Sequence, residues 1–277
     1  MNKIVVGLIV GTGMGEVLSE VALATHRGCV LETPFGGPVH YLVVDTEKAS
    51  LVIIDRHNSS EVFVPPKRLN WQSYMYVLWK LKVQYILATS AVGTPYKEKG
   101  GLRQGSMVVI ADAIDYVHGD YSFEREGFTD HLAFYRPTES IFCPHLRQAL
   151  EGGEYPSMSR FVLANSIRRP AYETLAEMNI RIRDGADVVG MPTAFPEALL
   201  AGELSIPYGL LCGVSNIAPA QHNGQAVGEV MRKMVPQMRD SVLRAVTWLA
   251  RNEHPADCSC RQGREKSVFE MLGIPSF

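Results

Sequence analysis

Residues 3–15 have the sequence KIVVGLIVGTGMG, and this stretch decides which type of fold we expect. The segment from Lys3 to Val10 is short, apolar and rich in β-branched residues, which is typical of a β-strand. Glycines at positions 11, 13 and 15 then indicate a flexible loop directly after this strand. A first strand that runs into such a loop is typical of an α/β protein.

Further strand-like segments recur along the chain and alternate with helical patterns. Short apolar runs predict strands at residues 41–44, 51–54, 85–88, 107–111, 161–164, 188–191 and 208–214. Helical spacing of apolar residues predicts helices over 72–82, 172–183 and 227–251. This alternation indicates a mostly parallel sheet that is covered on both faces. Because no linker divides the chain, we predict one domain over residues 1–277, with 251–277 as a C-terminal tail.

Length and composition exclude several classes of protein. The chain has 277 residues, of which 46% are hydrophobic and 20% charged, and its net charge is only −2. This near-neutral balance argues against nucleic acid as a partner, because neutralising phosphates needs a local excess of Lys and Arg. No apolar run is long enough to span a membrane, and the first residues lack the cleavage site of a signal peptide. We therefore expect a cytoplasmic α/β protein without membrane or nucleic-acid partners.

The five cysteines fall into two groups. Three occur singly in apolar segments and are expected to be small buried hydrophobic residues: Cys29, Cys143 and Cys212. The other two, Cys258 and Cys260, follow His254 in a polar tail. This trio suggests a metal, but its spacing fits no standard zinc pattern and a fourth ligand is missing. A local redox pair or an inert tail is favoured, so no metal is expected.

Polar residues follow several predicted strands at their carboxyl ends, where open α/β sheets bind ligands. Gly11, Thr12 and Gly13 would let a backbone and a hydroxyl approach an anion closely. Their spacing fits neither a dinucleotide fingerprint nor a P-loop, and a simple tight turn explains them as well. Arg56 and His57 place a charged fork beside a titratable donor, which suits phosphate. For an isolated pair of this kind, a surface salt bridge is the commoner explanation.

Eight motifs follow one another along the chain: Gly11-Thr12-Gly13, Glu32 to Gly36, Arg56-His57, Ser90 to Gly93, Tyr172 to Glu177, Gly185 to Met191, Pro196-Glu197 and Ser215-Asn216. With these motifs in this order, the chain resembles the trimeric branch of the purine nucleoside phosphorylase / 5′-methylthioadenosine phosphorylase family. The pattern is most similar to that of the methylthioinosine-type members. No single motif would be sufficient, but the resemblance extends over almost the whole chain.

The resemblance implies a single-domain nucleoside phosphorylase-like α/β fold, with a mixed, mostly parallel central sheet flanked by helices. It also implies phosphorolysis, in which phosphate attacks the ribose C1′ and the purine leaves through an oxocarbenium-like transition state. Inorganic phosphate would be the co-substrate, and neither a metal nor an organic cofactor is implied. The expected assembly is a homotrimer or a dimer of trimers, with a purine nucleoside and phosphate as small-molecule partners.

The family's phosphate site can be carried over by position onto four residues: Thr12, Arg56, His57 and the backbone of Ala91. Pro192 stands where the family has a hydroxyl residue, and proline offers neither a hydroxyl nor an N–H group. Thr193 is the residue that would replace the missing donor. His57 and Asn216 are the expected catalytic residues.

The base site is implied in the same way. Tyr172 matches the aromatic residue that packs against the base, and Asn216 matches the residue that hydrogen-bonds purine N7 and O6. Glu173 matches a carboxylate that accepts the purine N1–H. Hypoxanthine and guanine carry this proton and adenine does not, so the pair favours a 6-oxopurine. The alternative is that Glu173 lies in the first turn of a helix and satisfies only its dipole.

The sugar site carries the second statement about specificity. Met191 matches the residue under the ribose, and His131 resembles a residue that a neighbouring subunit lends to the 5′ pocket. Val227 stands where enzymes for ordinary nucleosides have a histidine that contacts the 5′-hydroxyl. An apolar wall favours a methylthio group, because a hydroxyl there would be left unpaired. The expected substrate is 5′-methylthioinosine, with 5′-methylthioadenosine second.

Three departures from the family pattern keep other functions open. Pro192 removes donors from the phosphate cradle, and Arg168 and Arg169 bring two charges near the base site. Glu61 would repel phosphate if it pointed inward. The alternatives are a methylthioadenosine phosphorylase, a nucleoside hydrolase and a non-catalytic nucleoside-binding relative. Only phosphorolysis needs phosphate and gives a sugar 1-phosphate.

Overall fold

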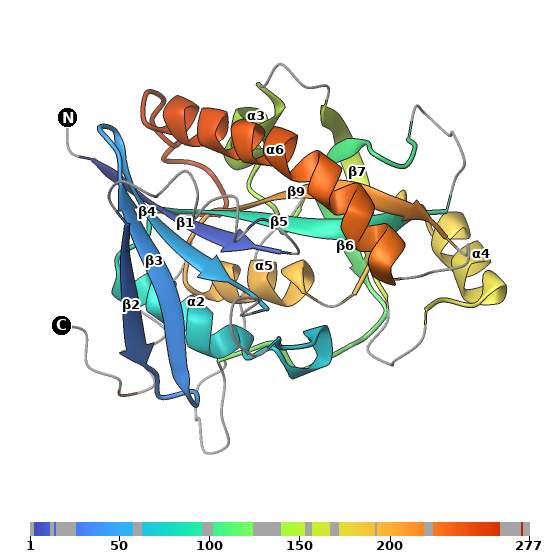
Figure 1. Ribbon diagram of the computed structural model, residues 1–277, viewed down its shortest axis with the longest axis horizontal. Coiled ribbons are helices and arrows are strands. Elements are labelled where there is room, and N and C mark those ends of the chain that lie inside the picture. Colours follow the sequence, from blue (N-terminus) through green and yellow to red (C-terminus); the bar gives the residue numbers. More distant parts are fainter. Residues whose placement is uncertain are drawn as a thin grey trace.

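A nine-stranded sheet lies at the centre of the computed structural model (Figure 1). The structure describes residues 3–11, 14, 26–57, 63–95, 102–123, 140–152, 157–166, 172–191, 193–218, 224–260 and 273. The strands are β1 (Ile4–Val10), β2 (His26–Glu32), β3 (Pro38–Asp45), β4 (Ala49–Asp55), β5 (Tyr85–Thr94), β6 (Met107–Asp115), β7 (Ser157–Asn165), β8 (Val188–Gly190) and β9 (Tyr208–Ile217). The helices are η1 (Pro66–Arg68), α2 (Trp71–Lys80), α3 (Pro144–Glu151), α4 (Leu175–Arg183), α5 (Ala194–Glu203) and α6 (Gly224–Leu249).

The strands follow the order β2-β3-β4-β1-β5-β8-β7-β6-β9, and β9 also pairs with β5. This additional pairing closes β5, β8, β7, β6 and β9 into a ring, so that half of the sheet is a small barrel. Five of the nine pairings are parallel and four are antiparallel. The predicted mixed, mostly parallel sheet is therefore confirmed. The closure of the ring has no signal in the local sequence.

The predicted strands all have a counterpart in the sheet, whereas β2 is missing from the prediction. Its sequence, HRGCVLE, has an apolar run of only three residues, and β2 lies at the edge of the sheet, where it pairs only with β3. Val30 in this strand is 55% exposed. Cys29 is only partly buried for the same reason, which corrects the expectation that it belongs to the core.

Helix α4 begins later than its apolar spacing predicts. Thr174 is the N-cap: its hydroxyl accepts a hydrogen bond from the Glu177 amide, and the Glu177 carboxylate accepts one from the Thr174 amide. Glu173 therefore precedes the cap and is not a residue of the first turn. The expected place of Glu173 in the first turn is wrong, and its role at the base stays a prediction.

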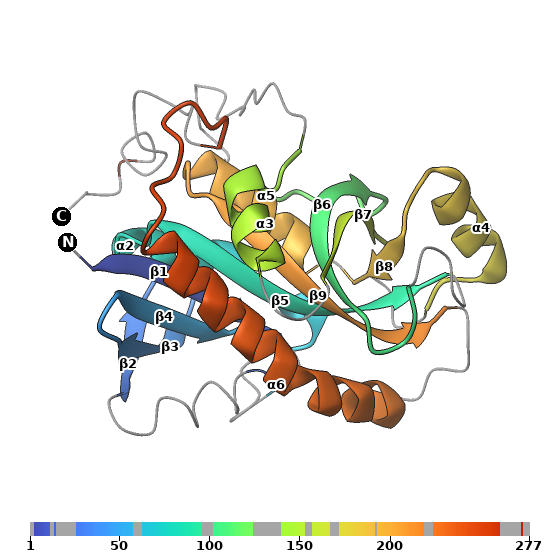
Figure 2. The same ribbon diagram turned by 90° about the horizontal axis from the view of Figure 1, so that it is seen from above.

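Helices cover both faces of the sheet (Figures 1 and 2). On one face, α2 and α5 pack on the cluster that contains Ile9, and on the other face α3 and α6 pack on the cluster that contains Leu8 and Val10. Neighbouring residues of β1 belong to different clusters because successive side chains of a strand point to opposite faces. This arrangement is the predicted one. Helix α3 has apolar residues at helical spacing (Leu146, Ala149 and Leu150), but it is only eight residues long and was not predicted. The almost wholly apolar α5 lacks a polar face that would have predicted it.

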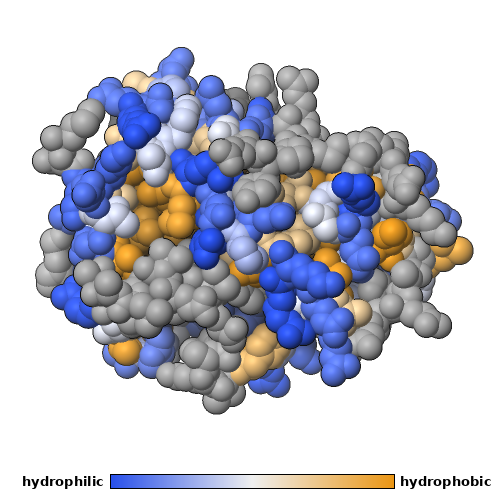
Figure 3. Space-filling view, turned by 45° about the horizontal axis from the view of Figure 1, so that its top comes forward, coloured by the Kyte–Doolittle hydropathy of each residue, from blue (hydrophilic) through white to orange (hydrophobic). Residues whose placement is uncertain are grey.

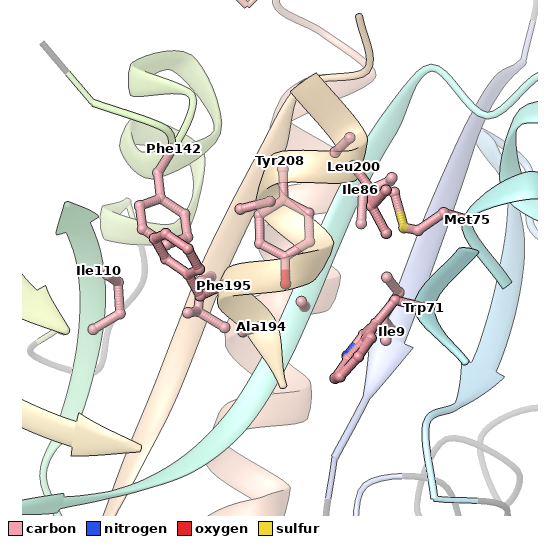
Figure 4. Close-up of a cluster of buried hydrophobic side chains, with 14 of the residues drawn as sticks. Ile9, Trp71, Met75, Ile86, Ile110, Phe142, Ala194, Phe195, Leu200 and Tyr208 are labelled. Carbon is pink, nitrogen blue, oxygen red and sulfur yellow. The ribbon is translucent and has the colours of Figure 1, made fainter. Parts of the chain in front are cut away.

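Figure 4 shows the core on the α2 and α5 face. Met75 of α2, Leu200 of α5 and Ile86 of β5 are each at most 1% exposed and lie together. Tyr208, at the start of β9, is also fully enclosed, and its ring lies 6.0 Å from that of Phe142. A buried phenol needs a hydrogen-bond partner for its hydroxyl. Tyr208 finds this partner in the site described below.

Helix α6 is the longest helix among the described residues and contains Pro236 in its interior. Proline removes one backbone hydrogen bond and bends a helix, and Figure 2 shows α6 changing direction along its length. Neither α6 nor another described helix combines the length and the apolar character needed to cross a membrane.

Figure 3 shows one face of the molecular surface. Hydrophobic residues are visible there between hydrophilic ones in the left half of the view.

Candidate active site

The predicted site residues gather at one edge of the sheet. Gly11 follows β1, Arg56 and His57 follow β4, and Thr193 lies shortly after β8. Because β1 pairs in parallel with both β4 and β5, and β5 pairs in parallel with β9, the carboxyl ends of these four strands meet. Asn216 lies near the end of β9 and completes the group.

The loop after β1 runs very close to β5. The Gly11 amide donates a hydrogen bond of 3.2 Å to the Thr89 hydroxyl. A Cβ atom on residue 11 would lie 2.9 Å from the Thr89 carbonyl oxygen and 3.0 Å from Nη1 of Arg56. Only glycine fits here, so the motif does more than form a tight turn. Thr12, the predicted phosphate ligand of this loop, lies outside the described residues.

The Arg56 side chain is buried beside a buried carboxylate from α5. Its Nε and Nη2 groups donate to the two carboxylate oxygens of Glu197 at 2.5 and 2.8 Å, and Nη1 donates to the Thr89 carbonyl at 2.9 Å. The side chains of Arg56 and Glu197 are 1% and 0% exposed. This two-point contact is the strong form of an arginine–carboxylate pair. The alternative of an exposed surface salt bridge is therefore wrong.

Two tyrosines complete the surroundings of Glu197. The Tyr74 hydroxyl donates to Oε1 at 2.8 Å, and the Tyr208 hydroxyl donates to Oε2 at 2.6 Å. Burial, and then the charge of Glu197, raise the pKa of both phenols well above the ordinary value. Burial opposes the charge of Arg56, but the Glu197 carboxylate more than offsets it and keeps the guanidinium pKa raised. We call these four residues the Glu197 network.

The Glu197 network leaves part of the Arg56 guanidinium for other contacts. A guanidinium carries five N–H donors, and three of them take part in the bonds to Glu197 and Thr89. The predicted contact of Arg56 with phosphate would use the remaining donors. Glu197 neutralises the charge in the free protein, so Arg56 acts there as a placed donor more than as an unpaired cation.

His57 lies next to Arg56 and is 6% exposed. Its Nδ1 is 2.8 Å from the Val64 carbonyl, and its ring stacks on Phe63 at 5.2 Å between centroids. Burial, which outweighs the contact with Val64, lowers the His57 pKa below its ordinary value. The ring is therefore neutral at pH 7, with the Nδ1 proton donated to Val64 and Nε2 as an acceptor. A neutral ring of this kind can accept a hydrogen bond from a protonated phosphate oxygen.

Two hydroxyl groups face each other between β5 and α5. Ser90 Oγ and Thr193 Oγ1 are 3.5 Å apart, and Thr193 is the N-cap residue of α5. Backbone amides and the helix dipole at such a position favour an anion. Ala91, whose backbone is the predicted phosphate ligand, directly follows Ser90. The motif contained Ser90, but its side chain was not among the predicted site residues.

Asn216 has a defined orientation at the end of β9. Its Oδ1 lies 2.8 Å from the Ser215 hydroxyl, which donates to it. A Cβ atom on Gly93, the β5 residue paired with Asn216, would lie 2.8 Å from Asn216 Nδ2. Gly93 thus makes room for the amide. The predicted catalytic side chain is fixed by both of its neighbours.

The predicted base and sugar residues follow the next strands of the ring. Tyr172 and Glu173 lie between β7 and α4, and Met191 directly follows β8, which pairs in parallel with β7. Tyr172 and Met191 are 52% and 38% exposed, so both side chains are accessible to a ligand. Their contact with a purine and a ribose stays a prediction.

The 5′ pocket is described only in part. Val227 is half-buried in the first turn of α6 and packs on the same apolar cluster as Ala91. His131, the predicted residue from a neighbouring subunit, lies outside the described residues. The same holds for Glu61, Arg168, Arg169 and Pro192, on which the alternative functions depend.

Residues 5–247 match the phosphorylase superfamily, which is most of the chain. The chain belongs to this superfamily. Its α/β fold and the family resemblance stated above are thereby confirmed.

Individual relatives agree with this assignment. The chain is 31% identical to a probable 6-oxopurine nucleoside phosphorylase of Moorella thermoacetica, over 84% of this chain and 90% of that one. It is 30% identical to a probable S-methyl-5′-thioinosine phosphorylase of Methanocaldococcus jannaschii, over 87% and 90% of the two chains. The adenosine/methylthioadenosine phosphorylase of Schistosoma mansoni, solved as a mutant with methylthioadenosine, shares the fold with a TM-score of 0.78 at 24% identity, over 91% and 93% of the chains.

One partner in this phosphorylase site had no predicted role. Glu197 belongs to a quoted motif, but its pairing with Arg56 joins residues 141 positions apart. The signal was the acid itself, because Glu197 interrupts the apolar sequence AFPEALLA. A carboxylate on a buried helix needs a cationic or hydrogen-bonding partner.

The Glu197 network yields a prediction for stability. Glu197→Gln should lower the free energy of unfolding by about 3–5 kcal/mol, because Arg56 is then a buried charge without a counter-ion. Tyr208→Phe removes one donor and keeps the ion pair, so it should cost about 1–3 kcal/mol. Urea unfolding followed by circular dichroism measures both. The exposed Glu47→Gln is the control, and a Glu197→Gln protein as stable as this control would contradict the network.

Proposed function

We propose that this member of the phosphorylase superfamily is a purine nucleoside phosphorylase. It transfers the pentosyl group of a purine nucleoside to inorganic phosphate and releases the free base and a (deoxy)ribose 1-phosphate. The observation that carries the proposal is the pair of sites at one sheet edge: the hydroxyls of Ser90 and Thr193 beside Arg56, and the oriented amide of Asn216. The first suits an anion, and the second suits a purine edge.

The phosphate site is proposed to consist of groups that donate hydrogen bonds. Ser90 and Thr193 supply hydroxyl groups, and the backbone amide of Ala91 follows directly after Ser90. Arg56 supplies the N–H groups that are not bonded to Glu197 and Thr89. Thr193 at the N-cap of α5 thus takes over the donor role that Pro192 cannot fill. His57, with Nε2 as an acceptor, would accept a hydrogen bond from a phosphate hydroxyl. Donors placed in advance stabilise a developing charge without reorganisation.

The base is proposed to leave with the help of Asn216. Negative charge develops on the purine ring as the bond to C1′ breaks, and a hydrogen bond to N7 and O6 that strengthens at this stage lowers the barrier. Glu173 would accept the N1–H of a 6-oxopurine. Glu173 lies ahead of the α4 N-cap, and the capping box uses Glu177, so the cap does not need the Glu173 carboxylate. The names of the Moorella and Methanocaldococcus relatives support the same class of base.

The preferred substrate is proposed to be 5′-methylthioinosine. Val227 is half-buried on an apolar cluster, where a methylthio group gains from contact and a hydroxyl loses water without a replacement. Met191 and Tyr172 would cover the ribose and the base. The S-methyl-5′-thioinosine phosphorylases among the relatives support this choice. 5′-Methylthioadenosine remains the second candidate, because an apolar 5′ wall suits it equally.

The assembly and setting are proposals of the same kind. A homotrimer, with His131 of one chain in the 5′ pocket of the next, follows from the resemblance to the trimeric branch. The five cysteines are all free thiols, as is common in the reducing cytoplasm, which is where purine salvage by this enzyme would take place. Sedimentation analysis of the purified chain gives its mass in solution.

The decisive experiment is a panel of nucleosides assayed with and without phosphate. Inosine, adenosine and their 5′-methylthio forms are incubated with the protein, and the base and sugar products are separated. Phosphorolysis gives the sugar 1-phosphate only when phosphate is present. Free sugar in the absence of phosphate would assign a hydrolase instead, and no turnover in either condition would assign a binding protein.

The hydroxyl pair predicts the phosphate requirement. Thr193→Val keeps the shape of the side chain but removes its hydroxyl, so the KM for phosphate should rise about tenfold, the effect of one lost hydrogen bond. The KM for the nucleoside should change much less. Thr247→Val, which removes a hydroxyl from α6 away from the site, is the matched control. An unchanged phosphate KM in both Thr193→Val and Ser90→Ala would place phosphate elsewhere.

The contact between Gly93 and Asn216 predicts an effect on the base. Gly93→Ala places a methyl group against the Asn216 amide, so kcat/KM for the nucleoside should fall by about tenfold or more. Gly28→Ala is the control, because Gly28 also lies in a strand and its added methyl group meets nothing within 4 Å. Steady-state kinetics at saturating phosphate measures the difference. Equal activity of the two variants would contradict the assigned place of the amide.

The 5′ pocket predicts a ratio of activities. The wild-type protein should use 5′-methylthioinosine at least about tenfold better than inosine in kcat/KM, because an unpaired hydroxyl costs about 1–3 kcal/mol. Val227→His should narrow or reverse this ratio by offering the hydroxyl a partner. Val230→His, one turn further along α6, controls for a general effect on the helix. Equal use of both nucleosides by the wild type would remove the methylthio preference and leave the 6-oxopurine assignment intact.

A further inference from the structure

Four side chains with soft or imidazole ligand atoms meet at the end of the molecule away from the proposed active site. Cys143, His254, Cys258 and Cys260 each place one ligand atom within 4.8 Å of the others. Cys143 is the N-cap of α3, and the other three lie in the segment after α6, which turns back toward α3 (Figure 2). The ligand that the local spacing lacks is thus supplied from 111 residues away.

The distances between these atoms suit one tetrahedral metal. Cys143 Sγ lies 3.2 Å from His254 Nε2, 3.5 Å from Cys260 Sγ and 3.9 Å from Cys258 Sγ. Cys260 Sγ lies 3.3 Å from His254 Nε2 and 3.0 Å from Cys258 Sγ. Around a zinc ion with bonds of about 2.3 Å to sulfur and 2.0 Å to nitrogen, the edges of a tetrahedron measure roughly 3.5–3.8 Å. The five distances differ from these edges by at most about 0.8 Å, and the sixth, between His254 and Cys258, is no longer than 4.8 Å, so small side-chain rotations bring the four atoms around one ion.

The groups around the cluster favour the forms of His254 and Cys143 that bind a metal ion. His254 Nδ1 lies 3.0 Å from the Pro255 carbonyl, so Nδ1 carries the proton and Nε2 turns its lone pair to the cluster. Cys143 is the N-cap residue of α3, so its sulfur lies at the N-terminus of that helix. The positive end of the helix dipole at this position favours a thiolate, the form of cysteine that binds metals.

We propose that Cys143, His254, Cys258 and Cys260 bind one zinc ion. Three thiolates and one imidazole are a soft donor set that selects zinc over magnesium or calcium. Because all four positions are protein ligands, no place is left for water or substrate, and the site is structural. It fastens the segment after α6 to the start of α3. The expectation of an inert tail or a local redox pair rested on the missing fourth ligand, and Cys143 removes that premise.

The four-residue cluster lies at the opposite end of β5 from the proposed active site. The ring of Tyr85, the first residue of β5, lies 5.9 Å from the ring of His254. Ser90 to Gly93 lie toward the other end of the same strand, among the residues of the proposed active site. Loss of zinc is therefore expected to act on stability, with little direct effect on a reaction at the carboxyl ends of the strands.

The test begins with metal content. The full chain is produced in zinc-supplemented medium, purified with a reductant and analysed by inductively coupled plasma mass spectrometry. We expect about one zinc per chain, bound at least about tenfold more weakly in Cys258→Ser and Cys143→Ser. Cys29→Ser, which removes a thiol from the edge strand β2, should keep the full amount. Zinc-free wild-type protein, or equal zinc in Cys258→Ser and Cys29→Ser, would overturn the proposal.

A second measurement uses only the wild-type protein, so its result does not depend on whether a variant folds. Replacement of zinc by Co²⁺ in the wild type should give the intense visible bands of a tetrahedral cobalt site together with thiolate-to-cobalt charge transfer. A chelator should abolish these bands and lower the thermal midpoint, because a ligand that binds only the folded chain stabilises it. Mass spectrometry of the same sample under non-reducing conditions counts the free thiols. A Cys258–Cys260 disulfide in freshly prepared protein, or weak octahedral cobalt bands, would show that the cluster is not a metal site.

Discussion

The ion pair between Arg56 and Glu197 is the constraint on which the site depends. Both side chains are almost fully buried, so neither charge can exist there without the other. The pair connects the end of β4 to α5, and the hydroxyls of Tyr74 and Tyr208 extend the connection to α2 and the start of β9. One carboxylate therefore holds Arg56 in place and connects it to three other elements of the fold.

Close packing of backbone around this pair explains two of the glycines. Gly11 passes within contact distance of Arg56, and Gly93 passes equally close to Asn216, so a side chain at either position would displace a functional group. The two glycines, which have no side chain, therefore leave the space that Arg56 and Asn216 occupy. Gly11 directly follows β1 and Gly93 lies in β5, and these two strands are parallel neighbours in the sheet. The position of one site relative to the other is then set by the sheet.

The sequence predicted what depends on short-range pattern and missed what depends on distant partners. The apolar run of β1 and the helical spacing of α6 were sufficient to place both elements. The exposed edge strand β2 and the closure of the β5–β9 ring were not predicted, since burial and pairing there are decided by other parts of the chain. Arg56 and Asn216 could be predicted because each lies in a short motif. The pairing of Glu197 with Arg56 and the contact of Cys143 with Cys260 could not be predicted, because the partners are more than a hundred residues apart.

Helix α6 connects the two ends of the molecule. Val227 lies in its first turn, against the cluster that also receives Ala91, and the segment with His254 follows its last turn. Between them, Pro236 interrupts the backbone hydrogen bonds, so the two halves of the helix are not held as one straight rod. Packing on the sheet must then fix each half separately. A metal that fastens the residues after α6 would secure the second half, while Val227 in the first half, and with it the wall of the 5′ pocket, packs on the apolar cluster of this face.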